Sequence, residues 1–356
     1  MNSEIGVAIV GAGYWGQNLI RNFWDADGCR LVCVCDTDSL VLSKALRRYP
    51  TIEVMQDYAA VLRHLGVDAV VIATPPSTHF EFARRALEAG KHVLVEKPLA
   101  TSTTEVEQLI ELASARQKTL MVDHTFLYTA AVRRMKQLMD AGEIGDLLYY
   151  DSVRINLGLL QSDTNVLWDL GPHDFSILDH LCHLNPKSVS AIAGKHFGYP
   201  FEDIVYVTVR FDSSLIAHFH LNWLSPVKVR LTLVGGSKKM IVYDDMESNE
   251  KVKVYDKGVS VNQSPETRTR LLASYRQGNM FAPHLDTTEA LRLVAREFLS
   301  SVAENRVPMT DGAAGYRVVR LLEAAQRSMD ENGRERGLPE ATVHPRSISA
   351  ERGPRG

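Results

Sequence analysis

The sequence contains no apolar run long enough to cross a lipid bilayer, which takes about 20 residues. Its longest apolar stretches, such as residues 69–73, have the length of a β-strand. The chain also runs from Met1 through Glu4 directly into the apolar residues 7–10, without a charged leader or a small-residue cleavage site. We therefore expect a protein that is not exported, has no membrane partner and is located in the cytoplasm.

An excess of basic charge is also missing. The chain has 40 Lys and Arg against 43 Asp and Glu, which gives a formal net charge of -3. These charges are spread along the sequence, so no basic field attracts phosphate backbones or anionic lipid. We expect no nucleic-acid partner.

Cysteine is scarce, and no CxxC pair occurs. The chain has four cysteines, of which Cys29, Cys33 and Cys35 surround one apolar run. This pattern favours buried packing residues in a reducing compartment over a metal site. We predict no metal cofactor.

The length of the chain predicts two domains, because single hydrophobic cores stop growing near about 250 residues. The first part alternates short β-branched runs with amphipathic segments, which is typical of a parallel sheet covered by helices. The predicted strands are residues 6–10, 30–35, 52–54, 68–73, 92–95 and 119–122. After the fourth strand, Thr78 and Glu81 are spaced as a capping box, and Gly90 ends the predicted helix.

The pattern changes near residue 123 to longer alternating runs, which indicate an antiparallel sheet. These strands are predicted at residues 147–155, 204–211, 215–223, 229–234, 240–243 and 251–255. Amphipathic segments at residues 131–140, 175–183, 291–303 and 314–329 would cover one face and leave the other for a contact between subunits of a homodimer or homotetramer. The predicted division is residues 1–122, residues 123–330 and a polar, partly mobile tail at residues 331–356.

A glycine-rich turn follows the first predicted strand. Gly11, Gly13 and Gly16 form the GxGxxG pattern that lets a helix amino terminus approach a pyrophosphate. Asp36 ends the second strand 20 residues after Gly16, where a carboxylate can bind an adenosine ribose. A simple glycine turn with a solvated aspartate is the alternative. We predict a Rossmann nucleotide-binding domain that prefers NAD to NADP, because Asp36 would repel a 2′-phosphate and Thr37 offers it no charge.

Further residues are expected at the same sheet edge. The expected cofactor contacts are Gly11, Gly13, Tyr14, Trp15, Gly16, Asp36, Thr37, Ala73, Thr74, Pro75, His79, Glu96 and Lys97. Lys97 is the most informative of them. It stands between Glu96 and Pro98 in the sequence, at the end of the fifth predicted strand. Beside a cationic nicotinamide such a lysine becomes a usable proton donor or relay. A surface Glu-Lys pair is the alternative.

These segments together resemble the Gfo/Idh/MocA oxidoreductases, a family that includes glucose-fructose oxidoreductase and inositol dehydrogenases. The resemblance spans most of the chain and rests on residues 7–16, 73–75, 79, 89–93, 96–100, 142–145, 168–174 and 315–325. It implies a Rossmann domain followed by an α+β domain with an open, mostly antiparallel sheet. It also implies hydride transfer between a nicotinamide and a secondary alcohol of a sugar, cyclitol or nucleotide sugar.

In that family the lysine of the EKP motif and an Asp-x-x-x-His pair line the substrate pocket. The resemblance implies these catalytic roles for Lys97, Asp169 and His173. Gly171 and Pro172 suit the start of a helix, which would place His173 in its first turn. A packing or capping histidine is the alternative, and Asp174 is a secondary candidate.

The segment before this motif departs from many relatives, because residues 163–168 contain no glycine triplet. This variant is similar to a subgroup associated with nucleotide-sugar metabolism. The expected substrate contacts are Lys97, Tyr128, Arg154, Asn156, Asn165, Asp169 and His173. Two alternatives to a dehydrogenase stay open at this point: an NAD-dependent glycosidase that oxidises its substrate transiently, and a dinucleotide sensor without activity.

Overall fold

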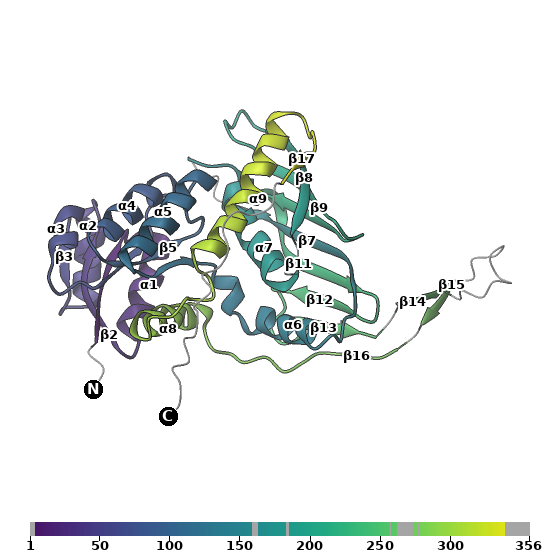
Figure 1. Ribbon diagram of the computed structural model, residues 1–356, viewed down its shortest axis with the longest axis horizontal. Coiled ribbons are helices and arrows are strands. Elements are labelled where there is room, and N and C mark those ends of the chain that lie inside the picture. The colour runs from purple at the N-terminus through teal and green to yellow at the C-terminus, as the bar shows by residue number, and fades with distance from the viewer. Residues whose placement is uncertain are drawn as a thin grey trace, which may run out of the picture.

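The computed structural model describes residues 4–158, 163–182, 185–256, 258–261, 273–276 and 278–338. Two sheets lie side by side, with helices α7 (Val166–Cys182) and α9 (Gly312–Asp330) between them (Figure 1). The predicted tail is described only up to Leu338, so residues 339–356 lie outside the described part. No helix of the described residues is long and apolar enough to cross a membrane.

The first sheet has six parallel strands in the order β3-β2-β1-β4-β5-β6. They are β1 Ile5–Val10, β2 Cys29–Cys35, β3 Glu53–Met55, β4 Ala69–Ile72, β5 His92–Glu96 and β6 Leu120–Asp123. The connecting helices are α1 Tyr14–Trp24, α2 Ser39–Arg48, α3 Tyr58–Arg63, α4 Pro76–Glu88 and α5 Thr103–Arg116. Strand order reverses between β1 and β4, so ligands of such a sheet bind beyond the carboxyl ends of these two strands.

The second sheet has nine strands in the order β16-β13-β12-β11-β7-β10-β9-β8-β17. They are β7 Leu147–Leu157, β8 Pro186–Gly194, β9 Ile204–Phe211, β10 Ile216–Asn222, β11 Leu224–Gly236, β12 Met240–Asp244, β13 Val252–Tyr255, β16 Met280–Phe281 and β17 Arg336–Gly337. All neighbours are antiparallel except β7 and β10. The fold class predicted from the sequence is confirmed. A separate ribbon, β14 Gly258–Val261 with β15 Ala273–Arg276, extends away from the body (Figure 1).

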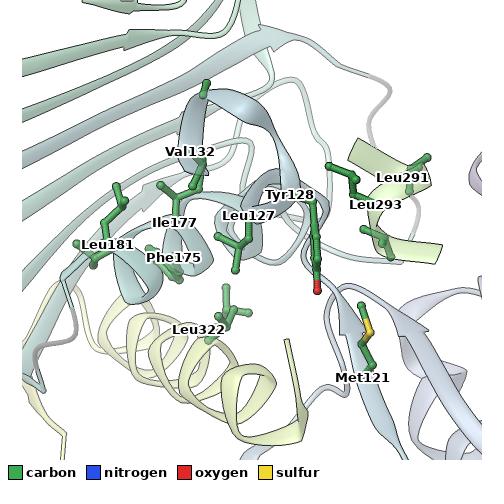
Figure 2. Packing of buried hydrophobic residues seen from close by; sticks show 14 of the residues in the cluster. Met121, Leu127, Tyr128, Val132, Phe175, Ile177, Leu181, Leu291, Leu293 and Leu322 are labelled. Atoms are coloured by element: carbon green, nitrogen blue, oxygen red, sulfur yellow. The ribbon is translucent and has the colours of Figure 1, made fainter. Parts of the chain in front are cut away.

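The second half also contributes η1 Thr125–Tyr128, α6 Ala130–Asp140, α7 Val166–Cys182, α8 Ala290–Ala303 and α9 Gly312–Asp330. Figure 2 shows the buried cluster where these helices meet β6, with Leu127 of η1, Phe175 of α7, Leu293 of α8 and Leu322 of α9. On β9 and β10, Val207 and Phe219 face this core and are fully buried. No helix of the described residues covers the opposite face of these strands, which the alternating burial of β9 reflects.

Helix α8 does not cover the second sheet, so that part of the sequence prediction is wrong. The helix returns to the first half of the chain, where Phe298 packs against Phe23 of α1 in a T-shaped arrangement with the ring centres 6.2 Å apart. Arg21 of α1 also binds Glu289, the residue before α8, through two hydrogen bonds of 2.6 and 2.8 Å. An amphipathic pattern identifies an apolar face but not the surface that buries it.

Two predicted helix starts are also wrong. Helix α4 begins at Pro76 rather than at a capping box, and Thr78 lies inside its first turn, where its hydroxyl bonds to Pro75 O at 2.7 Å. Helix α7 begins at Val166, so Pro172 lies inside it. Pro172 lacks the N–H that would bond one turn back, yet packing of this buried segment outweighs that loss.

Candidate functional site

The glycine turn lies at the point where the strand order reverses. Gly11 has a φ of 90° and lies against β4, since a Cβ at this residue would be 2.5 Å from Ala73 O. A Cβ at Gly16 would be 2.0 Å from Gly11 O, so this residue must also be glycine. Gly13, in contrast, has open space on its Cβ side within 4 Å. The amino terminus of α1 is therefore packed on one side and open on the other, which fits a pyrophosphate.

Asp36 is held beside this turn. Its Oδ2 accepts a hydrogen bond of 2.6 Å from Ala12 N, and its Oδ1 accepts one of 2.9 Å from Asp38 N. Thr37 is exposed, and its carbonyl accepts a hydrogen bond from the Gln56 side chain. The expected carboxylate thus lies at the carboxyl end of β2, next to the glycine turn. Tyr14 and Trp15 are exposed there, at 88% and 41%.

Lys97 connects the two halves of the molecule. This residue directly follows β5. Its Nζ donates hydrogen bonds to Asp169 of α7, to the carbonyl oxygen at 2.7 Å and to Oδ1 at 3.3 Å. The other carboxylate oxygen accepts a hydrogen bond of 3.1 Å from Trp223 Nε1, which follows β10. Lys97 is largely buried, and Asp169 is fixed from two sides. The structure therefore brings two of the three predicted catalytic residues into direct contact.

His173 lies one helical turn after Asp169, so both side chains leave α7 on the same side. Its ring packs against the Phe126 ring in a T-shaped arrangement, with the ring centres 5.0 Å apart. Burial lowers the pKa of His173 well below its usual value, and the positive charges of Lys97, Arg154 and Arg230 lower it further. Its Nδ1 is buried without a hydrogen-bond partner among the described residues. The ring is therefore neutral at neutral pH and has a nitrogen available.

Two carboxyl groups pair beside Lys97. Glu96 of β5 and Asp123 of β6 are register partners, nearly fully buried and hydrogen bonded to each other. Burial raises the pKa of both, that of Asp123 to about 6 and that of Glu96 well above its usual range. Since two adjacent carboxylates in a buried site cannot both ionise easily, the pair keeps one proton at neutral pH. Thr125 Oγ1 donates to Asp123 Oδ1 at 2.8 Å.

His79 joins the loops that follow β4 and β5. It is 1% exposed, with Nε2 2.8 Å from Thr74 O and Nδ1 2.7 Å from Pro98 O. Burial lowers its pKa. The ring thus links the two loops of the predicted cofactor edge, residues 73–75 and residues 97–98. The peptide bond between Lys97 and Pro98 is cis.

The structure separates the predicted polar substrate contacts. Tyr128 lies in the core cluster of Figure 2, and its hydroxyl is 3.1 Å from Thr310 Oγ1. Asn165 caps α7, since its Oδ1 accepts from Trp168 N, while its Nδ2 donates to Glu202 and Gln326. Both side chains are therefore engaged in holding the fold.

The other two lie closer to the Lys97 cluster. A Cβ at Gly158 would be 3.2 Å from Asn156 Nδ2 and 2.8 Å from the Trp223 ring, which places Asn156 near the indole that binds Asp169. Arg154 is 3% exposed, binds Asp174 at 2.7 and 2.9 Å and lies over the Phe126 ring. Asp174, a secondary catalytic candidate, is therefore the buried partner of Arg154.

Sequence reasoning missed several members of the site. Asp123 ends β6 and His124 follows it, at the same edge as Lys97, so the edge rule that selected Lys97 could have found them. His124 is fully buried, which lowers its pKa to about 3. Trp223 and Arg230 gave no sequence signal, because only the pairing of the strands in the second sheet brings them to the site. No group of three or more His, Cys, Asp or Glu that could hold a metal ion occurs in the described part of the chain.

Comparisons with known proteins agree with this geometry. Residues 5–124 match the model of an oxidoreductase family with an NAD-binding Rossmann fold, and residues 132–242 match the GFO/IDH/MocA C-terminal domain. A scyllo-inositol 2-dehydrogenase (NAD(+)) of Bacillus subtilis is 27% identical over 292 residues, which cover 77% of this chain and 84% of that protein.

Two further comparisons differ in extent. A glycosyl hydrolase family 109 protein of Shewanella amazonensis is 31% identical, but over only 43% of this chain and 36% of that protein. The UDP-N-acetylglucosamine 3-dehydrogenase GnnA of Acidithiobacillus ferrooxidans has a similar structure, with a TM-score of 0.78 and 22% identity over 92% of this chain and 98% of that one. At this identity the structural likeness concerns the fold alone.

Gly13→Ala tests the dinucleotide site. Because the Cβ side of Gly13 is open, we expect a change below about 1 kcal/mol in the free energy of unfolding, which is the usual range for glycine at a helix start. The added methyl would occupy the approach to the α1 amides, so NAD affinity should fall by about tenfold or more, equivalent to about 1.4 kcal/mol. Calorimetric titration with NAD measures this, with Gly337→Ala as an equally open control. Unchanged NAD affinity of Gly13→Ala would place the dinucleotide elsewhere.

Asp123→Asn tests the buried carboxyl pair. The folded state raises the pKa of Asp123 from 3.8 to about 6, so it retains a proton that the unfolded chain releases in this range. Stability of the natural protein should therefore fall as the pH rises through this window, and Asp123→Asn should remove part of that loss. Urea unfolding at about pH 4.5 and about pH 8 compares the two proteins, and we expect a relative gain for the variant on the order of 2 kcal/mol at the higher pH.

Asp212→Asn, at a side chain that is 79% exposed, is the control and should change stability equally at both pH values. A pH-independent difference between Asp123→Asn and the natural protein would contradict the shared proton.

Proposed function

Because the chain belongs to the Gfo/Idh/MocA family of NAD-binding oxidoreductases, we propose that it transfers hydride between NAD and a secondary alcohol of a sugar, cyclitol or nucleotide sugar. The bond between Lys97 Nζ and Asp169 is the observation that carries this proposal. It joins the end of β5, at the edge where a dinucleotide binds such a sheet, to the helix that bears His173. The inositol dehydrogenase of B. subtilis supports the substrate class.

The protein's own groups would align the alcohol and manage its proton. NAD, when bound, accepts or returns the hydride at its nicotinamide ring. Lys97 Nζ, oriented by Asp169, donates a hydrogen bond to the substrate oxygen. His173, neutral and with a free ring nitrogen, takes the hydroxyl proton as the hydride leaves. In the reverse direction, His173 returns the proton to the oxygen while Lys97 keeps its hydrogen bond to that oxygen.

Neither alternative from the sequence is favoured. The hydrolase relative of Shewanella matches less than half of this chain, whereas the inositol dehydrogenase matches more than three quarters. A sensor without activity would have no need for a buried lysine fixed against a carboxylate beside a neutral histidine. The glycine turn, by itself, would suffice for dinucleotide binding.

Lys97→Ala and His173→Ala should each lower kcat by about 100- to 10,000-fold, the usual contribution of a proton-transferring group. NAD affinity should stay within about threefold, because neither side chain lies at the glycine turn. The measurement is NADH absorbance across a panel of inositols, free sugars and nucleotide sugars, followed by NAD titration of each variant.

Lys228→Ala, at an exposed residue of β11, is the control and should retain full turnover. Full activity of both site variants would refute the assigned roles. Release of reducing sugar from a glycoside without accumulation of NADH would instead support the glycosidase.

We further propose that the protein forms a homo-oligomer through the uncovered face of its second sheet. Ile192 of β8 and Tyr206 of β9 are register partners on this face and are 63% and 46% exposed. Tyr206 stacks on His220 of β10 at 4.4 Å, so an apolar and aromatic row crosses three strands. Exposed apolar rows of this kind mark contacts between proteins.

Tyr206→Glu should convert the oligomer to monomers, because a carboxylate at the centre of this row would be buried in the contact. Sedimentation velocity measures the mass. Leu65→Glu, at a residue that is 99% exposed on the other half of the chain, is the control. A monomeric natural protein, or an unchanged mass of Tyr206→Glu, would contradict the proposed contact.

A reducing location such as the cytoplasm stays a proposal based on the cysteines. All four are free thiols. Burial raises the pKa of Cys33 to about 12, so this thiol stays protonated and unreactive.

A further inference from the structure

Two arginines lie opposite each other next to His173. Arg154 of β7 and Arg230 of β11 are register partners, so their side chains leave the same face of the second sheet. Both guanidinium groups lie over the Phe126 ring, at 4.5 and 5.8 Å from its centre. The His173 ring packs against the same ring in a T-shaped arrangement. One phenylalanine thus holds two cations and the predicted catalytic base together.

Like charges in this position repel each other, and the nearby acids do not balance them fully. Arg154 binds Asp174, and both side chains are almost fully buried. Arg230 Nη1 donates to Asp245 Oδ2 at 3.2 Å, but Asp245 also accepts a hydrogen bond of 2.9 Å from Lys251 Nζ. Three cations therefore share two carboxylates, and the cluster keeps a positive charge.

Each guanidinium also has a donor without an acceptor. Arg154 Nη1 and Arg230 Nε are buried and have no hydrogen-bond partner among the described residues. A buried polar group that lacks its partner costs about 1–3 kcal/mol, and more if it is charged, so such groups in a native fold call for an acceptor. Two guanidinium groups on one face of the sheet, each with an unpaired donor, suit an oxyanion better than a neutral hydroxyl.

We propose that Arg154 and Arg230 bind an oxyanion of the substrate, a carboxylate or a phosphate group, next to the hydroxyl that is oxidised at His173. This inference rests on the proposed function, because His173 defines the reacting end of the substrate. The enzyme then prefers an acidic sugar to its neutral counterpart. The bound anion also offsets the positive charges that lower the pKa of His173, which makes its ring a stronger base when substrate is present.

The experiment compares matched substrates that differ in one charged group: D-glucuronate with D-glucose, D-glucose 6-phosphate with D-glucose, and UDP-glucuronate with UDP-glucose. For the natural protein with NAD, we expect a higher kcat/KM for the acidic member of at least one pair. The first and third pairs report a carboxylate, and the second pair reports a phosphate.

Arg230→Gln is the test variant, because this side chain is 32% exposed and its loss leaves Asp245 bound to Lys251. The ratio of kcat/KM for the acidic over the neutral member should fall by about 10- to 100-fold, as expected for a hydrogen bond between charged groups. Arg230→Lys keeps the positive charge but loses the paired N–H donors of the guanidinium. Its kcat/KM ratio should therefore lie between those of the natural protein and Arg230→Gln. Arg334→Gln, at a side chain that is 75% exposed, is the control and should leave the ratio unchanged.

Calorimetric titration of the protein–NADH complex with glucuronate and with glucose 6-phosphate separates this inference from the proposed function. Anion binding that depends on Arg230 supports the subsite even if none of these sugars is oxidised. Oxidation of a sugar by the natural protein with an equal ratio in Arg230→Gln, and no Arg230-dependent anion binding, would overturn the subsite while leaving the dehydrogenase intact.

Discussion

The contact between Lys97 and Asp169 is the constraint on which the site depends. An ammonium that follows a strand of the first sheet is fixed against a carboxylate on a helix that packs on the second sheet. Neither half of the chain could hold this geometry by itself, because the lysine and the histidine belong to different halves. Trp223 completes the arrangement by holding the second oxygen of the carboxylate. Alignment of the two halves is therefore part of the chemistry.

Burial then sets the protonation states around this contact. Lys97 lies close to the paired carboxyl groups of Glu96 and Asp123, which share a proton, and to three histidines that its charge helps to keep neutral. A neutral imidazole is a proton acceptor, and a carboxyl pair that shares one proton presents a single negative charge to the ammonium. The site thus combines groups whose environments move their pKa values in opposite directions, which is common where protons are transferred.

Local patterns in the sequence predicted much of this arrangement. The glycine turn, Asp36 and Lys97 all follow strands of a parallel sheet, so a single rule about strand ends assigned them to one edge. The same approach failed for α4 and α7, because both helices extend further toward their amino termini than the local capping signals suggest. It failed for Trp223 and Arg230 for a different reason. Their positions depend on strand register between segments far apart in the chain, and no local pattern contains that information.

The return of α8 to α1 has a consequence for dissection of the molecule. Phe23 is fully buried, and one wall of its environment is Phe298, 275 residues later in the chain. The edge strand β6 is covered in the same way, since Val122 exchanges hydrogen bonds with Thr310. A fragment that stops after β6 would expose this aromatic face and an open strand edge, both of which promote aggregation. Residues from the last third of the polypeptide therefore cover apolar surface and a strand edge of the nucleotide-binding half. We do not expect this half to fold as an isolated fragment.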